Sequence, residues 1–354
     1  MNVLILTGRF GMGHIRCAEA LKECMLTQTG GAVNVETVDL LEYLFPRAAR
    51  QIYAGFGKFV SFCPDLYNRL NLLAGENENS LPFRKVCCEK MSVLMRRYRP
   101  DLVIANLPLC VQFFSLFKEQ TGDRTPLYVY VTDITFHREW VAPRANLYFV
   151  GDTVTQKAIL AQGVAAKDVH ITGIPVSGAF RAPQVRGEGR RQILVMGGGL
   201  GILPGGTETL EILHCLREAD VTLVCGTNQK LRRLAEERYP DFRILGCTDR
   251  VPQLMRQADV LITKPGGITT FEAIRSELPL LCIAPTLEQE LGNASFIERH
   301  GFGKIVYEKS DFTAEGLAAF LRDGELAEMR RNMRQYLAAT EPQNPLFYFA
   351  RTAS

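Results

Sequence analysis

Short runs of apolar residues recur along the chain, and each is followed by a stretch with helical spacing. In the first half these runs have strand length, and they cover Val3–Thr7, Asn34–Asp39, Leu102–Ala105, Leu127–Thr132, Leu147–Val150 and Val169–Thr172. The second half repeats the pattern at Gln192–Met196, Val221–Cys225, Arg243–Leu245, Val260–Thr263 and Leu280–Ile283. Buried strands that alternate with helices, the first from about His14 to Leu26, predict parallel sheets covered on both faces.

The two halves resemble each other. Each opens with a strand that runs into a glycine-rich loop, LILTGRFGMGH in the first half and ILVMGGGLGILPGG in the second. An α/β fold of two doubly wound, Rossmann-like domains facing across a cleft is expected, with ligands at the carboxyl ends of the strands. The expected division is an acceptor domain (1–175), a linker rich in Gly and Pro (176–190) and a donor domain (191–335), with 336–354 as the candidate for a helix that crosses back.

Composition narrows the function classes. The chain has 354 residues, of which 47% are hydrophobic and 22% charged, with a net charge of +3. This is the balance of a globular protein, and the charge is too small to favour nucleic acid as a partner. No apolar run reaches the roughly 20 residues of a membrane-spanning helix. The amino terminus lacks a basic region ahead of its apolar run, so a cytoplasmic location without a secretory signal is expected.

One segment departs from the alternating pattern. Residues 43–99 combine seven aromatic residues between Tyr43 and Tyr67 with six basic residues and one acidic residue between Arg84 and Arg99. A basic, aromatic and amphipathic insertion is typical of contact with an anionic membrane surface. A packed helical excursion with a solvated basic face would give the same pattern, so both interpretations stay open.

The first glycine loop leads directly into a helix. It reads Gly8-Arg9-Phe10-Gly11-Met12-Gly13-His14, and Arg16 stands where a dinucleotide fingerprint has its third glycine. Asp39 ends the next strand where a ribose-binding acid would lie, so an NAD site is not excluded. His14 lies at the start of the helix, where a neutral imidazole suits a general base. A helix-capping role for His14 is the simpler alternative.

A second polar group follows the strand that starts at Leu127. Thr132 and Asp133 are expected at its carboxyl end, with His137 and Trp140, the one tryptophan of the chain, on one helical face beyond it. An aspartate at a strand end is often only a helix cap. Its proximity to the other groups favours a place in the site.

The second half carries an anion-binding pattern. A strand, a Pro-Gly-Gly turn and a helix start follow one another in DVLITKPGGITTFEA, residues 259–273. The amides of Gly266, Gly267 and Ile268 are predicted to face a phosphate, and Glu272 is placed for the two hydroxyls of a ribose. Gln289 and Glu290, after the next strand, suit sugar hydroxyls. The chain has no Asp-x-Asp and no GxxxxGK[ST], so no metal–diphosphate clamp and no NTPase loop is expected.

Several separated segments together resemble the glycolipid branch of the GT-B glycosyltransferases, the diacylglycerol glucosyltransferases and monogalactosyldiacylglycerol synthases of glycosyltransferase family 28. They are GMGH at 11–14, VTD at 131–133 with His137 and Trp140, ITGIPV at 171–176, GGGLG at 197–201, VCG at 224–226 with Asn228, TKPGG at 263–267, and Gln289-Glu290 with Asn293. The family usually has Pro-Gly before Gln-Glu, whereas this chain has Leu287-Glu288, which puts the sugar in doubt.

The resemblance implies an inverting transfer of a hexose, glucose before galactose, from a UDP-sugar to diacylglycerol or a glycolipid. It assigns the proton of the acceptor to His14, with Asp133 as its orienter or as the rival base. The substrate-binding residues that it implies are Gly13, His137, Trp140, Gly199, Asn228, Lys264, Gly266, Gly267, Ile268, Glu272, Gln289, Glu290 and Asn293. Neither a cofactor nor a metal is implied, and the enzyme is expected on the inner face of the cell membrane, peripherally bound.

Three alternatives to a diacylglycerol hexosyltransferase are compatible with the sequence. The chain could be a UDP-sugar epimerase, a UDP-GlcNAc-type transferase that acts on a polyprenyl-linked acceptor, or a non-catalytic nucleotide-sugar sensor. The Asp133–His137–Trp140 spacing favours the glycolipid synthases over the transferase that completes the lipid-linked peptidoglycan precursor. Lipid-dependent release of UDP would separate the first interpretation from the others.

Overall fold

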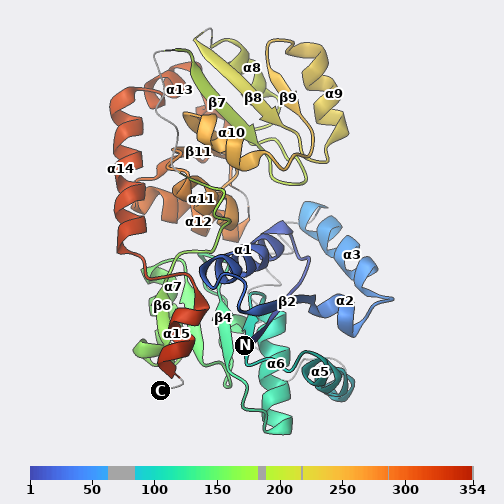
Figure 1. Ribbon diagram of the computed structural model, residues 1–354. Coiled ribbons are helices and arrows are strands. Elements are labelled where there is room, and N and C mark those ends of the chain that lie inside the picture. Colours follow the sequence, from blue (N-terminus) through green and yellow to red (C-terminus); the bar gives the residue numbers. More distant parts are fainter. Residues whose placement is uncertain (63–83, 182–188, 217, 286, 353–354) are drawn as a thin grey trace. The chain divides into compact units, whose positions relative to one another are not determined.

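The computed structural model describes residues 1–62, 84–181, 189–216, 218–285 and 287–352. It divides into two compact units (Figure 1). The first unit comprises Met1–Gly178 together with Thr340–Ser354, and the second comprises Ala179–Ala339. The chain therefore leaves the first unit once and returns to it at its carboxyl end.

The first unit is built on a six-stranded sheet in the order β2-β1-β3-β4-β5-β6, with parallel pairing throughout. The strands are β1 (Asn2–Thr7), β2 (Asn34–Asp39), β3 (Leu102–Ala105), β4 (Leu127–Tyr130), β5 (Leu147–Val150) and β6 (Val169–Ile171). Its helices are α1 (Met12–Gln28), α2 (Leu40–Leu44), α3 (Ala49–Phe62), α5 (Arg84–Tyr98), α6 (Pro108–Thr121), η1 (Arg138–Trp140), α7 (Thr153–Leu160), η2 (Ala166–Asp168) and α15 (Pro345–Thr352).

Helix α15 packs on the first unit, beside β6 (Figure 1). The ring of Tyr348 lies 4.9 Å from that of Phe149 and 4.4 Å from that of His170. The segment before the helix is hydrogen-bonded to the sheet, because the Glu341 amide donates to the Ile171 carbonyl and the Tyr130 hydroxyl donates to the Gln343 carbonyl. The return of the chain is thus fixed by backbone contacts as well as by aromatic packing.

The second unit repeats the architecture with the order β12-β11-β10-β7-β8-β9, again parallel. Its strands are β7 (Arg191–Met196), β8 (Ala219–Val224), β9 (Arg243–Leu245), β10 (Val260–Thr263), β11 (Leu280–Ile283) and β12 (Gly303–Val306). Its helices are α8 (Glu208–His214), α9 (Gln229–Arg238), α10 (Val251–Gln257), α11 (Gly267–Arg275), α12 (Glu288–Arg299), η3 (Lys309–Asp311), α13 (Ala314–Phe320) and α14 (Asp323–Ala339).

The predicted fold class is confirmed, with differences at the ends of elements. Strand β12 (Gly303–Val306) is not predicted by the apolar pattern, because it is a half-exposed edge strand that contains Gly and Lys. Strand β4 ends at Tyr130 rather than Thr132, and α1 begins at Met12 rather than His14. Both shifts lie in the polar connections, where local propensity defines an element least well.

In each sheet the first strand of the unit lies where the strand order reverses. Strand β1 has β2 on one side and β3 on the other, and β7 likewise lies between β8 and β10. Ligands of open parallel sheets bind at the carboxyl ends of the strands at this reversal. The site is therefore expected at the loops after β1 and β3 in the first unit and after β7 and β10 in the second.

Candidate functional site

At the strand reversal of the first unit, β1 and β3 end side by side. Leu6 of β1 is paired with Ala105 of β3, and the next residue of β3's chain is Asn106, which is fully buried. The loop after β1 leads into α1 (Met12–Gln28), whose first turn contains His14. Two polar side chains that are distant in sequence thus meet at one end of the sheet.

His14 and Asn106 are joined by two hydrogen bonds. The Nδ1 atom of His14 lies 2.9 Å from the backbone carbonyl oxygen of Asn106. In return, the side-chain amide of Asn106 donates to the backbone carbonyl of His14 at 2.6 Å. A carbonyl oxygen can only accept, so Nδ1 carries the proton and Nε2 keeps its lone pair. The hydroxyl oxygen of Thr132 lies 2.9 Å from the same Nδ1 atom.

The pKa of His14 is lowered from its ordinary value. Burial is the main cause, while the negative charge of Asp133 and the hydrogen bond to Asn106 act in the opposite direction. Burial disfavours the charged imidazolium, so the side chain is neutral near pH 7. Burial, rather than the helix end, is therefore the main cause that favours the neutral imidazole expected from the sequence.

Asp39, the candidate ribose ligand of an NAD site, is already engaged within the protein. Its Oδ1 atom accepts the amide of Glu42 at 3.0 Å as the cap of α2, and it accepts the hydroxyl of Tyr53 at 2.6 Å. The guanidinium of Arg9 lies 3.6 Å from Oδ2. A carboxylate with these partners is a structural cap, which removes the basis of the NAD interpretation.

His137 and Trp140 do not form the helical face that their spacing predicts. His137 directly precedes the short helix η1 without a side-chain cap hydrogen bond, and its Nε2 atom lies 3.4 Å from the hydroxyl oxygen of Thr135. Trp140 is fully buried in the core of the first unit. Trp140 is therefore a packing residue, and its predicted contact with substrate is corrected.

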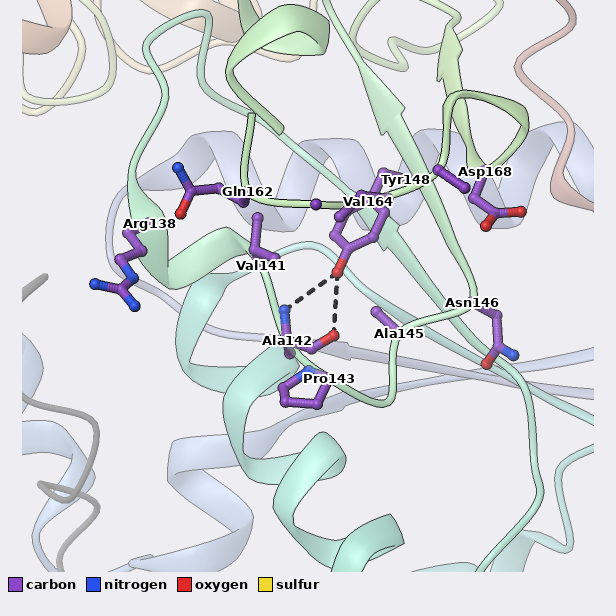
Figure 2. A pocket seen from close by; sticks show the side chains of 12 residues that line it. Arg138, Val141, Ala142, Pro143, Ala145, Asn146, Tyr148, Gln162, Val164 and Asp168 are labelled. Atoms are coloured by element: carbon purple, nitrogen blue, oxygen red, sulfur yellow. Dashed lines mark hydrogen bonds between the residues drawn. The ribbon is translucent and has the colours of Figure 1, made fainter. Parts of the chain in front are cut away.

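A shallow hollow of about 550 Å³ lies beyond η1, between the segment after Trp140 and the segment before β6. Figure 2 shows its floor, where the hydroxyl of Tyr148 is hydrogen-bonded to both the amide and the carbonyl of Ala142. Arg138 and Asp168 lie toward its two ends. None of the residues predicted for the site line this hollow.

In the second unit, the glycine loop after β7 packs against the loop after β8. A side chain at Gly201, where φ is +64°, would place its Cβ 1.8 Å from the carbonyl oxygen of Cys225. The amide of Thr227 donates to the carbonyl of Gly199 at 3.0 Å. The side chain of Asn228 donates to the carbonyl of Gly201 and accepts the amide of Leu231. Asn228 thus fastens the loop and caps α9, and its contact with the UDP moiety stays a prediction. Gly199 is exposed.

The turn after β10 is tighter than the sequence suggests. The amide of Gly266 donates to the carbonyl of Lys264 at 2.8 Å, so this amide does not point outward as predicted. Gly266 is the cap residue of α11, and Gly267 and Ile268 are its first two helical residues. Amides of a first helical turn have no carbonyl four residues earlier in the helix, so these two remain in the anion-binding arrangement.

Residues of α12 and of the turn after β10 meet beside this helix start. The ammonium of Lys264 lies 3.4 Å from Oε1 of Glu290, and Oε2 of Glu290 accepts the amide of Leu287 at 3.3 Å. The side-chain amide of Asn293 donates to the carbonyl of Pro265 at 2.8 Å. This bond ties α12 to the turn, so Asn293 has a structural contact that the sequence does not reveal.

Gln289 and Glu272, the other residues predicted to bind the UDP-sugar, differ in exposure. Gln289 is half-buried in the first turn of α12, next to Glu290. Glu272 is only 2% exposed, within α11. In the first unit, Gly13 lies between Met12 and His14 and is half-buried.

The basic and aromatic residues of 43–99 separate into two groups. Tyr43 donates to the carbonyl of Lys90, and the ammonium of Lys90 donates to the carbonyl of Leu44, so these residues pin α5 to α2. Arg96, Arg97 and Arg99 are exposed at the carboxyl end of α5. The carbonyl of Arg99 accepts the side-chain amide of Asn2, at the beginning of β1.

This contact places the three arginines at the amino edge of the sheet, opposite His14. A helix of 15 residues spans roughly 22 Å, so the start of α5 is far from these arginines. Tyr67 and Arg69, which belong to the predicted membrane segment, lie outside the described residues. Within the described part of the chain, no helix is both long and apolar enough to span a membrane. The same residues contain no group of three His, Cys, Asp or Glu side chains placed to hold a metal.

The sequence pattern does not identify Asn106 as a site residue, and it gives Thr132 a place at the site but no role. Asn106 is preceded by a buried strand and followed by Leu107-Pro108, and a polar residue after such a run is the signal that could have found it. Their partner, His14, is 92 residues from Asn106 and 118 from Thr132.

Two family models match the chain in succession. The model described as monogalactosyldiacylglycerol (MGDG) synthase matches residues 14–176, and the model of the glycosyltransferase family 28 C-terminal domain matches residues 192–344. A processive diacylglycerol beta-glucosyltransferase of Bacillus licheniformis is 28% identical over 351 residues, which cover 94% of this chain and 90% of that protein.

Solved structures show the same fold at low sequence identity. MurG of Acinetobacter baumannii has a TM-score of 0.63 with 16% identity, covering 97% of this chain and 96% of its own. The spinosyn rhamnosyltransferase SpnG, complexed with thymidine diphosphate, has a TM-score of 0.66 with 14% identity, covering 99% of this chain and 100% of its own. The two parallel six-stranded sheets thus match the GT-B fold of these structures.

Proposed function

Since this chain is a hexosyltransferase of the MGDG synthase and glycosyltransferase family 28 type, we propose that it transfers a hexose from a UDP-sugar to diacylglycerol. The glucosyltransferase relatives favour glucose over galactose as the hexose. An inverting reaction needs a base for the acceptor hydroxyl, a site for the diphosphate leaving group, and access to a lipid.

The base is His14, acting through Nε2. The observation that carries this assignment is the hydrogen bond from Nδ1 to the Asn106 carbonyl, because it fixes the tautomer in which Nε2 is unprotonated. Burial lowers the pKa and keeps the imidazole neutral before the reaction. Nε2 removes the proton of the acceptor hydroxyl as its oxygen attacks the anomeric carbon, and UDP departs from the opposite face. Asp133 stabilises the imidazolium that forms and is not itself the base.

The donor is held by the second unit. The amides of Gly267 and Ile268, together with the ammonium of Lys264, neutralise the charge that develops on the diphosphate. Glu272 binds the ribose, and Gln289 and Glu290 bind the hexose. The exposed Gly199 lets the loop after β7 approach the nucleotide, while Asn228 and Asn293 hold the two loops in shape.

The lipid-contact surface is α3 with the start of α5. Helix α3 (Ala49–Phe62) is amphipathic, and Ile52 is 41% exposed on it. We assign the basic part of the membrane contact to Arg84 and Lys85, with which the sequence of α5 begins, rather than to the arginines at its other end. Peripheral binding at an anionic membrane surface gives the enzyme access to an acceptor that is insoluble in water.

The test is the release of UDP from UDP-glucose, UDP-galactose and UDP-GlcNAc, with and without mixed micelles of diacylglycerol. Release that requires one sugar and the lipid, with a glycosyl-diacylglycerol product, supports the proposal and identifies the hexose. Lipid-independent release, or none with any of the sugars, contradicts it. His14→Ala is expected to abolish transfer and to leave UDP binding unchanged, whereas transfer near the wild-type rate would refute the base.

A further inference from the structure

The phenol of Tyr53, on α3, links two separate parts of the first unit. Its hydroxyl donates to Oδ1 of Asp39 at 2.6 Å. Its ring also packs against Phe10, with the ring centroids 4.9 Å apart and the planes at 73°. The end of β2 and the loop before α1 are thereby connected through one side chain.

The loop that Tyr53 contacts is also held by Arg9, whose guanidinium lies 3.6 Å from Oδ2 of Asp39 and 3.5 Å from Oε2 of Glu42. Gly11 is the N-cap residue of α1. Because glycine has no side chain, no side-chain hydrogen bond caps the start of this helix. At Gly8 an added Cβ would lie 2.8 Å from Cδ2 of Leu107 and 3.1 Å from the hydroxyl oxygen of Tyr53. The loop therefore passes between Leu107, next to Asn106, and Tyr53 on α3.

The hydroxyl of Tyr53 remains a donor under ordinary conditions. Burial raises the pKa of this phenol, and its hydrogen bond to Asp39 raises it further, while the Arg9 amide acts in the opposite direction. Asp39 is in turn fixed as the cap of α2. Because Tyr53 belongs to α3, its contact with the loop depends on where α3 lies.

His14 follows Gly11 by three residues, in the first turn of α1. A change in the path of the loop moves this turn, and with it the imidazole relative to Asn106. Small displacements of a reacting group cost large factors in rate. Ile52, next to Tyr53 on α3, is exposed. The helix that contacts the loop therefore also presents an apolar side chain to solvent.

We propose that Tyr53 is a positioning residue for His14, through which the binding of α3 to a lipid surface orders the loop at residues 8–11. This inference rests on the proposed function for its lipid. In it, α3 held at a membrane fixes Tyr53, and Tyr53 fixes Phe10 by ring packing and Arg9 through their shared partner Asp39. The first turn of α1 then presents Nε2 of His14 to the acceptor.

The first test compares Tyr53→Phe with Tyr43→Phe. Each variant loses one hydroxyl, but the hydroxyl of Tyr43 donates to the Lys90 carbonyl at 3.1 Å, between α2 and α5. With diacylglycerol in vesicles that contain anionic phospholipid, Tyr53→Phe is expected to lower kcat about tenfold. The KM for the UDP-sugar should stay within a factor of about two, since the donor residues lie in the other unit. Tyr43→Phe should leave both constants near wild type.

A second measurement separates this inference from the proposed function. Hydrogen exchange of the amides at residues 9–13 is followed with and without the same vesicles, in the absence of any sugar donor. Vesicles should slow this exchange in the wild type but not in Tyr53→Phe. This readout needs no transfer activity, so it still decides the coupling if the chain proves not to glycosylate diacylglycerol.

Three results would overturn the coupling. One is wild-type kcat in Tyr53→Phe with only a lower Tm, which is the result of a purely structural role. Another is an equal loss of kcat in Tyr43→Phe. The third is wild-type exchange at residues 9–13 that does not respond to vesicles.

Discussion

Two reciprocal hydrogen bonds join His14 and Asn106, which are 92 residues apart in the sequence. The imidazole donates to the backbone of Asn106, and the side chain of Asn106 donates to the backbone of His14. The first bond selects the tautomer and the second fixes the helical turn that carries the ring. Because Asn106 is fully buried, water cannot replace either bond at no cost.

Asn106→Ala is expected to lower kcat by roughly 10- to 100-fold, because the turn that carries His14 loses one of its two restraints. Loss of the buried hydrogen bond from the Asn106 side chain to the His14 carbonyl should also lower the free energy of unfolding by about 1 kcal/mol. UDP affinity, measured by calorimetry, should not change.

Asn146→Ala is the matched control. Asn146 accepts the amide of Leu127 at 2.8 Å and the ammonium of Lys118 at 3.1 Å, so its loss should destabilise the same unit. Its kcat should remain near wild type. Equal losses of kcat in both variants would show that Asn106 affects activity only through the stability of the first unit.

The activity should persist below the ordinary pKa of histidine, 6.5. Burial lowers the pKa of His14, so the base stays neutral as the pH falls through this value and becomes protonated only at lower pH. Asp133 raises the pKa of His14, and Asp133→Asn should therefore move the acidic limb of the kcat/KM profile further down. A shift of this limb to higher pH in Asp133→Asn would contradict the assignment.

The free energy of unfolding should also depend on the protonation of His14. The unfolded chain binds a proton at His14 near pH 6.5, whereas the folded chain does so only at lower pH, so folding is favoured above pH 6.5 and weakened as the pH falls below it. The slope is at most about 1.4 kcal/mol per pH unit for one group. His14→Gln should remove this part of the pH dependence in denaturant unfolding curves between pH 5 and about 7.5.

Gly201→Ala should disrupt the loop after β7 far more than Gly198→Ala. Both positions have positive φ, +64° and +68°, so both variants strain the backbone by roughly 1–2 kcal/mol. Only Gly201→Ala also brings its Cβ to 1.8 Å from a backbone oxygen, while Gly198 has open space. Thermal unfolding and UDP titration of the pair measure the difference, and similar Tm and Kd values would refute the described packing.

Lys264→Met should weaken UDP binding by roughly tenfold, because it removes a positive charge beside the start of α11. Lys304→Met is the control in the same unit, since Lys304 pairs with Glu325 at 2.7 Å and both are about half exposed. Calorimetric titration of UDP with each variant gives the comparison. An unchanged Kd in Lys264→Met would place the diphosphate elsewhere.

The basic residues of α5 should differ in their effect on lipid binding. Neutralising Arg84 and Lys85 is expected to reduce sedimentation with anionic vesicles severalfold. Neutralising Arg96, Arg97 and Arg99, at the opposite edge of the sheet, should change it little. The reverse order of effects would place the membrane surface at the amino edge.

The sequence by itself determined the parallel α/β fold. Buried strands such as Leu102–Ala105 and Leu280–Ile283 are continuous apolar runs, and this signal depends only on neighbouring residues. It also located His14 and the Pro265–Ile268 turn, because glycine-rich turns between a strand and a helix have a local pattern. The edge strand Gly303–Val306 was missed because half of it faces solvent.

Only the tertiary structure decided what each polar group contacts. Asn106 meets His14 because β3 is placed beside β1, Asp39 is occupied by Tyr53, and Trp140 is in the core rather than at the surface. The amide of Gly266 turns inward to Lys264, which no spacing rule reveals. Hydrogen bonds are short and directional, so which groups pair depends on strand order and loop paths that the whole chain sets.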